Sequence, residues 1–260
     1  MKILFHHVAR VPLGLFCLLL CSYIIAQDKK LVLGEHQLFH ASHTDSPMEI
    51  DGKMNEPAWQ KTETRSLDYF YGIEKDSDKQ NATFRMLWDD AYLYAFFDCD
   101  DKFLTASETK RDGRPYMDDC AELFLIPAPD SLEMHYGFEL NLYKASNDFI
   151  YLDNIYQGKK GSVYSYNPEF QVEVTYNGTL NDNSDIDVGW TMELAIPLNL
   201  FRGMEKFSPV QAGNQWAFLA LRQERNDPEP RRRVCSTIFP VYGIENVHHA
   251  RRFGLLEFVD

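Results

Sequence analysis

Cysteine is scarce in this sequence, with five residues in 260, and two of them, Cys17 and Cys21, lie in an apolar N-terminal segment. The other three, Cys99, Cys120 and Cys235, form an odd set without CxxC spacing, which argues against a disulfide framework or a thiolate zinc site. Cys99 and Cys120 lie inside apolar, strand-like runs, where a thiol usually behaves as a small buried hydrophobe. A single disulfide between these two stays open.

Positive charge and long apolar runs are also lacking. The chain has 26 Lys and Arg against 39 Asp and Glu, a net charge of −13 at pH 7. Such a chain repels phosphate backbones, so nucleic acid is not an expected partner. Its apolar runs are shorter than the roughly 20 residues that span a bilayer, so no integral membrane segment is expected in the mature chain.

The first 26 residues have the features of an export signal. Lys2 provides positive charge, Val11–Ile25 is mostly apolar, and Ala26 is a small residue suited to cleavage. Leu20 precedes Cys21 where a lipoprotein signal requires a small residue, so lipidation at Cys21 is not favoured. We therefore expect cleavage near Ala26 and an exported protein, whether periplasmic, cell-surface or extracellular.

Motifs of nucleophile, zinc and phosphate chemistry (GxSxG, HExxH and GxxxxGK[ST]) are absent, so no catalytic residue is assigned. Paired carboxylates stay open, because glycoside hydrolysis needs only two acids about 5–10 Å apart. Glu122, Glu139 and Glu224 lie on different expected strands. A hydrolase would use Glu122 with Glu139 or Glu224.

Strand-length runs separated by turn residues follow one another along most of the chain, a pattern typical of a sandwich or barrel. We expect an all-β fold, a β-sandwich of two antiparallel sheets with a few short helices, over residues 48–260. Residues 27–47, with His36, His40 and His43, are expected to be a lead-in strand and linker rather than a metal site. The expected strands are Thr83–Trp88, Tyr92–Asp98, Ala121–Ile126, Tyr136–Tyr143, Phe149–Leu152, Phe170–Tyr176, Trp190–Ile196, Trp216–Gln223, Val234–Phe239 and Gly254–Val259, and the expected helices are Glu56–Thr62 and Leu198–Met204.

One of these strands presents polar side chains in a row, and another follows an aromatic residue. Glu139 and Asn141 share one face of their strand, whose apolar residues share the other. An aromatic residue, Tyr116, comes shortly before the strand that contains Glu122. A saccharide fits such a surface, because a sugar ring stacks on an aromatic while its hydroxyls bind acids and amides. A solvent-facing sheet surface is the structural alternative.

Acidic residues at several turns offer oxygen ligands to a hard cation such as calcium. The acidic loop that begins at Asp182 does not fit a calcium-binding EF-hand, because Asp187 stands at the sixth position, where the sharp turn requires glycine. Calcium stays open as a cofactor, with no ligand set assigned. The remaining candidates are Asp89, Asp90, Asp98, Asp100 and Asp101.

Five segments carry a family resemblance in the right order: Ile50–Trp59, Leu87–Tyr94, Asp119–Phe124, Gly189–Pro197 and His248–Gly254. Together they resemble the family 9 carbohydrate-binding modules and their DOMON-like relatives, over roughly Met48 to Val259. The resemblance implies a β-sandwich whose concave end binds a glycan, often at a chain terminus, and which calcium commonly accompanies.

The resemblance also implies which residues bind the sugar. Tyr116 falls where the family places a stacking tryptophan, and Glu122 and Asn141 fall at hydroxyl-binding positions. Glu139 stands where some members have arginine. Two further positions that face the cleft in similar proteins are filled by Arg222 and His248.

The second aromatic wall departs from the family pattern. Val247 stands where a binding member has a tryptophan, and Tyr242 or Phe239 would have to replace it from the neighbouring loop. Some DOMON-like relatives instead bind haem, for which Met117 with His135 or His248 would be the ligands to test.

We therefore expect an exported, non-catalytic domain of carbohydrate catabolism that binds an oligo- or polysaccharide. A haem-binding electron-transfer domain and a glycoside hydrolase are the alternatives.

Overall fold

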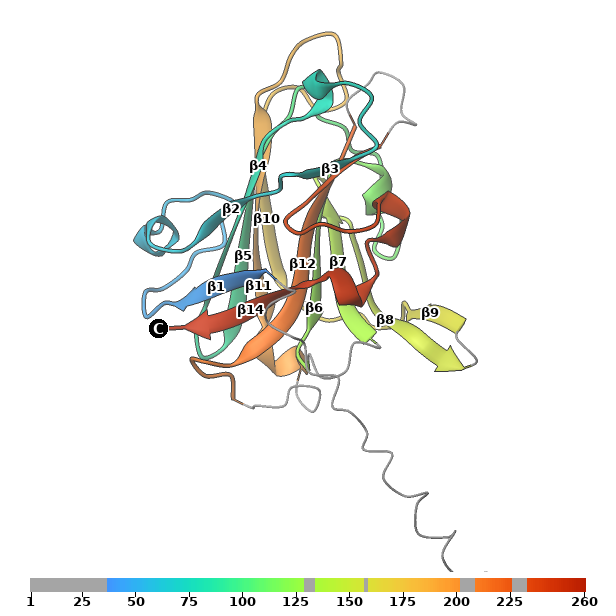
Figure 1. Cartoon of the computed structure of the whole chain (residues 1–260). Coiled ribbons are helices and arrows are strands. Elements are labelled where there is room, and N and C mark those ends of the chain that lie inside the picture. The colour runs from blue at the N-terminus through green and yellow to red at the C-terminus, as the bar shows by residue number, and fades with distance from the viewer. Residues whose placement is uncertain (1–36, 129–133, 157–158, 202–208, 226–232) are drawn as a thin grey trace, which may run out of the picture. The chain divides into compact units, whose positions relative to one another are not determined.

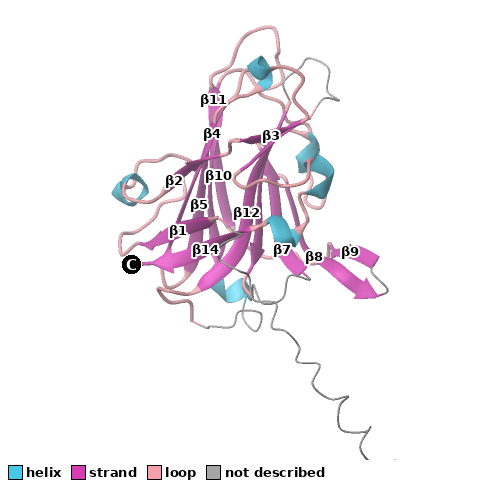
Figure 2. Ribbon diagram, in the orientation of Figure 1, coloured by secondary structure: helices cyan, strands magenta, loops and turns pink. Residues whose placement is uncertain are grey.

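Strands make up nearly all of the regular structure, and the described helices are 3-10 turns of three or four residues (Figure 2). The computed structural model describes residues 37–128, 134–156, 159–201, 209–225 and 233–260. None of the described helices is long and apolar enough to cross a membrane. The strands are β1 (Leu38–His43), β2 (Thr64–Ser66), β3 (Tyr69–Tyr71), β4 (Ala82–Trp88), β5 (Tyr92–Asp100), β6 (Cys120–Ile126), β7 (Met134–Asn141), β8 (Ser146–Tyr156), β9 (Lys159–Val163), β10 (Gln171–Asn177), β11 (Gly189–Pro197), β12 (Gln215–Glu224), β13 (Val234–Thr237) and β14 (Gly254–Val259), and the helices are η2 (Pro57–Gln60), η3 (Asp76–Asp78), η4 (Pro115–Met117), η5 (Leu198–Phe201), η6 (Ile244–Asn246) and η7 (Ala250–Arg252).

The main strands form two antiparallel groups that meet at β1 (Figure 1). One group has the order β10-β11-β5-β4, and the other has the order β14-β12-β6-β7-β8-β9. β1 lies between β4 and β14 and pairs in parallel with both, so hydrogen bonding continues from one group to the other. The predicted all-β sandwich is confirmed, with β1 as the strand that joins its two sheets.

Aromatic side chains from both groups pack against each other in the core. Phe84 of β4 and Phe218 of β12 have ring centroids 6.0 Å apart. Phe39 of β1 contacts both rings, at 5.6 and 5.5 Å. All three side chains are fully buried. Burying such large apolar surfaces is the main source of stability for a fold of this kind.

β1 comes from the segment expected to be a lead-in and linker. Only Phe39 and Ala41 of its six residues are fully buried hydrophobics, so its apolar signal is weak, yet it is an inner strand. The expected signal peptide, with Ala26 and Cys21, lies outside the described residues, as does His36.

The other expected strands are all present, with ends that differ by a few residues. Both expected helices are shorter 3-10 turns, η2 and η5, and residues 202–208 lie outside the described chain. Cys99, Cys120 and Cys235 are free and buried, so the disulfide left open between Cys99 and Cys120 is not formed. Burial raises the pKa of each thiol, which keeps it protonated and unreactive.

A buried carboxylate ties the N-terminal motif to the sheet. Glu193 of β11 is fully buried and accepts hydrogen bonds from the backbone N–H groups of Asp51 and Gly52, both at 3.0 Å, and from Trp59 Nε1 at 3.1 Å. Gly52 has a φ of 77°, which favours glycine. Trp59 packs with Phe96 in a second, smaller apolar cluster. Two of the five resembling segments therefore meet at this one side chain.

We predict that Glu193→Gln weakens the fold. At pH 8 the carboxylate serves three N–H donors, and an amide would turn an NH2 group toward at least one of them, at a cost of about 1–3 kcal/mol. Urea unfolding measures the loss. Glu173→Gln is the matched control, because Glu173 is the register partner of Glu193 on β10, its side chain is 45% exposed, and it pairs only with exposed Lys144. Equal losses in both variants would contradict the role assigned to Glu193.

Candidate functional site

A pocket of about 280 Å³ lies on the outer face of β6, β7 and β8. Glu122 of β6, Glu139 of β7 and Asn147 of β8 are successive register partners, so their side chains form one row on this face. The turn η4 adds Tyr116, and the segment after η6 adds His248. Four of the six predicted sugar-binding residues, Tyr116, Glu122, Glu139 and His248, are thus brought together here.

Two larger pockets lie elsewhere on the described surface. The pocket of about 580 Å³ is lined by Arg111 and Lys144, whose charges are matched by carboxylates. The pocket of about 420 Å³ is lined by Phe239 and Tyr242, so these two aromatics do not replace the missing wall beside Val247, which lines the smaller pocket. We place the candidate site in the smaller pocket because the predicted residues converge there.

The two glutamates form the polar floor of this pocket. Glu122 is 2% exposed and accepts a hydrogen bond from Gln223 Nε2 at 2.9 Å. Glu139 is 4% exposed and accepts one from Asn147 Nδ2 at 2.6 Å. The carboxylates face each other across neighbouring strands and are held by neutral amides rather than by cations.

Burial of this pair governs its charge. Desolvation raises the pKa of Glu122 to about 7, although Gln223, Arg233 and Arg225 lower it. Desolvation and the neighbouring Glu122 charge raise the pKa of Glu139 well above its ordinary value. Because two adjacent buried carboxyls resist ionising together, the pair retains a proton near neutral pH.

Aromatic side chains line the pocket above this floor. Tyr116 comes from η4, Phe149 and Tyr151 from β8, and Tyr164 from the turn after β9. Tyr164 is 55% exposed and its ring centroid lies 6.1 Å from that of Phe149. Phe149 lies across Gly137, where a Cβ would stand 2.3 Å from the ring. β8 and the turn after β9 therefore supply aromatics that sequence reasoning assigned to the loop near Val247.

His248 closes one side of the pocket as part of a stack of rings. Its ring lies nearly parallel to those of Tyr151 and His135, at 4.8 and 5.3 Å. His248 Nδ1 and His135 Nε2 are hydrogen-bonded at 3.2 Å. Burial lowers the pKa of His248 to about 4, with a contribution from Lys160, and lowers that of His135 well below its usual range. Both imidazoles are neutral at pH 7 and bind each other, whereas the haem alternative required one of them to face iron.

Asn141 lies on the same face but outside the pocket. It is fully buried, and its amide nitrogen donates to the carbonyl of Glu108 and to Asp118, at 2.8 and 2.7 Å. Its oxygen accepts from the N–H groups of Tyr143 and Ala145. All four hydrogen-bonding positions of the amide are used, so Asn141 supports the loop instead of contacting a ligand.

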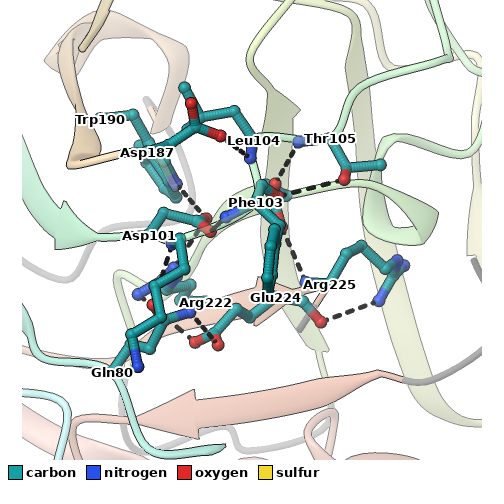
Figure 3. A network of polar contacts seen from close by, with 12 residues as sticks. Gln80, Asp101, Phe103, Leu104, Thr105, Asp187, Trp190, Arg222, Glu224 and Arg225 are labelled. Atoms are coloured by element: carbon teal, nitrogen blue, oxygen red, sulfur yellow. Dashed lines mark hydrogen bonds and ion pairs between the residues drawn. The ribbon is translucent and has the colours of Figure 1, made fainter. Parts of the chain in front are cut away.

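Arg222 is on the opposite side of β12, because its neighbour Gln223 lines the pocket. It is fully buried between the sheets, with an ion pair to Asp101 at 2.8 Å and another to Glu224 at 3.4 Å (Figure 3). Glu224 shares this face and accepts a hydrogen bond from Gln80 at 2.6 Å. The structure thus separates Arg222 from the other predicted sugar-binding residues and separates Glu224 from Glu122 as a catalytic pair.

Two of the acids considered for calcium are committed to local structure. Asp89 accepts hydrogen bonds from the N–H groups of Ala91 and Tyr92 and from the Tyr94 hydroxyl. Asp101 is paired with Arg222. Among the residues that the structure describes, no three His, Cys, Asp or Glu side chains are grouped as metal ligands. Asp89 and Asp101 are therefore already used by the protein's own hydrogen bonds and ion pairs.

Glu139→Gln should remove part of a pH dependence of stability. Burial raises the pKa of this carboxyl above its ordinary 4.5, so the folded state keeps a proton that the unfolded state releases. The free energy of unfolding of the wild type therefore falls as pH rises from about 4.5 through the folded pKa, by up to ~1.4 kcal/mol per pH unit for one group.

Urea unfolding between pH 5 and pH 8 tests this sign. Glu139→Gln should gain stability relative to the wild type as pH rises, while Glu173→Gln, on the other sheet, should follow the wild type. If the free energy of unfolding changed with pH in the same way for the wild type and Glu139→Gln, burial would not raise the pKa of this carboxyl.

Comparisons with known proteins agree with this fold. The sequence model of a family described as "Carbohydrate family 9 binding domain-like" matches residues 50–259. A family 9 carbohydrate-binding module from Caldicellulosiruptor kristjanssonii in complex with cellotriose is 19% identical, with a TM-score of 0.57 over 86% of this chain and 94% of that chain. A structure with the same description in complex with glucose is 18% identical, with a TM-score of 0.57 over 85% and 95%.

A candidate carbohydrate-binding protein from Bacteroides uniformis ATCC 8492 is 16% identical, with a TM-score of 0.64 over 86% of this chain and 99% of that chain. No curated protein matches the chain. At these identities the solved structures show a shared fold, and the family match covers most of the sequence.

Proposed function

Because the chain belongs to the carbohydrate family 9 binding domain-like family, we propose that it binds the end of a glycan in the pocket formed by β6, β7 and β8. Family membership makes it a carbohydrate-binding domain. The proposal adds which face of the protein binds the glycan and which part of the glycan enters the pocket. Cellotriose and glucose, which are bound by the structural neighbours, are the first ligands to test.

One observation carries this proposal: buried polar groups and accessible aromatic rings line the same small pocket. Glu122, Glu139 and Gln223 supply acceptors at the floor, and Tyr116 and Tyr164 supply ring faces near the opening. A pyranose ring needs both, because its hydroxyls need hydrogen-bond partners while its C–H face stacks on an aromatic. A volume of about 280 Å³ suits a chain end better than the middle of a long chain.

Export is part of the same proposal. Residues 1–26 would direct the chain out of the cytoplasm, where free polysaccharide and its fragments are encountered. The free cysteines do not oppose this, since each is buried.

Removing either accessible aromatic side chain should weaken binding with little effect on stability. We expect Tyr116→Ala and Tyr164→Ala each to weaken binding of cellotriose by about 1–2 kcal/mol, or roughly 5- to 30-fold, through lost stacking area. Isothermal titration calorimetry measures the change. Tyr176→Ala is the control, because Tyr176 is 48% exposed and lies on β10 of the other sheet. An unchanged affinity in both pocket variants would exclude this pocket as the binding site.

A second function has one observation in its favour. Glu122 and Glu139 are direct register partners, and a buried pair that shares a proton offers one acid and one carboxylate, as glycoside hydrolysis requires. Incubation of the protein with cello-oligosaccharides, followed by chromatography of released sugars, separates the two functions. A binding domain releases no sugar. A hydrolase releases sugar, and the Glu122→Gln substitution abolishes that release.

A further inference from the structure

The floor of the pocket has more hydrogen-bond acceptors than the protein supplies donors for. We propose that the sugar at this site carries a primary amine, and that its ammonium group binds between Glu122 and Glu139. This inference rests on the proposed sugar-binding function and names the class of sugar. It follows from three features of the floor: the number of donors, the balance of charge, and an amide oxygen without a partner.

Each floor glutamate receives a single hydrogen bond. Within the described residues, Glu122 Oε2 and Glu139 Oε1 have no protein partner, because the amides of Gln223 and Asn147 each serve only one oxygen. Two other buried acids of the chain accept more hydrogen bonds. Asp118 accepts four hydrogen bonds and Glu193 accepts three. A buried carboxylate with one donor is costly unless something else supplies the rest.

The charges around the pocket also favour a cation. Three carboxyl groups line it, those of Glu122, Glu139 and Glu245, against one guanidinium, that of Arg233, while Lys160 lies outside the lining and acts on His248. Arg233 makes no hydrogen bond or ion pair to either floor glutamate, and it acts on Glu122 only at longer range. Arg225 is turned away, toward the carbonyls of Tyr116 and Met117. His248 is neutral near pH 7 because its pKa is about 4.

Gln223 provides an independent sign of a missing donor. Its side chain is 3% exposed and lines the pocket, and its Oε1 is buried without a hydrogen-bond partner. Its NH2 group is already directed to Glu122, so the amide oxygen must face elsewhere. Three acceptors of residues that line the pocket therefore lack a donor from the described protein residues, namely Glu122 Oε2, Glu139 Oε1 and Gln223 Oε1, and the proton that the glutamate pair retains can serve only one of them.

An ammonium group meets this demand better than a hydroxyl. It has three N–H donors and a positive charge, whereas a sugar hydroxyl supplies one hydrogen and no charge. Binding would also release a proton, because a cation beside the pair favours ionisation of both carboxyls. The aromatic rings above the floor select a sugar that carries the amine over a simple alkyl amine.

Three trimers of equal length and linkage test the proposal by calorimetry near pH 7: β-1,4-linked glucosamine, N-acetylglucosamine and glucose. We expect the glucosamine trimer to bind at least about tenfold more tightly than the other two. Glu139→Gln and Glu122→Gln should abolish that preference, while Glu173→Gln on the other sheet should retain it. Titrations in two buffers of different ionisation enthalpy should show proton release for the amine only.

The results distinguish this proposal from the function on which it rests. If glucose or N-acetylglucosamine trimers bind as tightly as glucosamine, the amine proposal is wrong and the carbohydrate-binding function stands. If no trimer binds to protein shown to be folded, both are wrong. If the amine preference survives Glu139→Gln and Glu122→Gln, the ammonium binds elsewhere and the assigned floor is wrong.

Discussion

Side-chain alternation along β12 is the constraint on which both the core and the pocket depend. Arg222 and Gln223 are neighbours in the chain, yet one is sealed between the sheets and the other lines the pocket. A shift of one residue in strand register would exchange them and leave a guanidinium facing the glutamate floor. The ion pair of Arg222 with Asp101 opposes such a shift, because breaking it would leave two buried charges unpaired.

Buried carboxylates on the two faces of this sheet have different kinds of partner. On the core face, Asp101 and Glu224 lie beside Arg222, so their charges are balanced within the protein. On the pocket face, the described residues that hydrogen-bond to Glu122 and Glu139 are neutral amides, and arginines act on Glu122 only at longer range. Proteins usually avoid such an arrangement, since it lowers stability, and where it persists it often marks a site at which a ligand completes the set of partners.

Much of the fold could be predicted from the sequence, because most strands carry strong apolar runs and clear turns. The Glu139 and Asn141 face was also visible, as their strand alternates. β12 was harder, since all but its first residue are buried and no polar alternation shows which side Arg222 occupies. Phe149 and Tyr151 lie on a strand that was predicted. Their place in the pocket depends on pairing between β7 and β8, a non-local fact that residue patterns alone do not determine.

Pocket geometry depends on residues that touch no ligand. Asn141 and Asp118 hold the loop that precedes η4, and Arg225 donates to the carbonyls of Tyr116 and Met117. The backbone of Tyr116 is thereby held on the short turn η4 by its carbonyl. The family resemblance implied that Asn141 binds a sugar hydroxyl, but all four hydrogen-bonding positions of its amide are used within the protein. Its hydrogen bonds to Glu108 and Asp118 instead hold the loop beside the pocket, while the polar floor of the pocket is formed by Glu122 and Glu139.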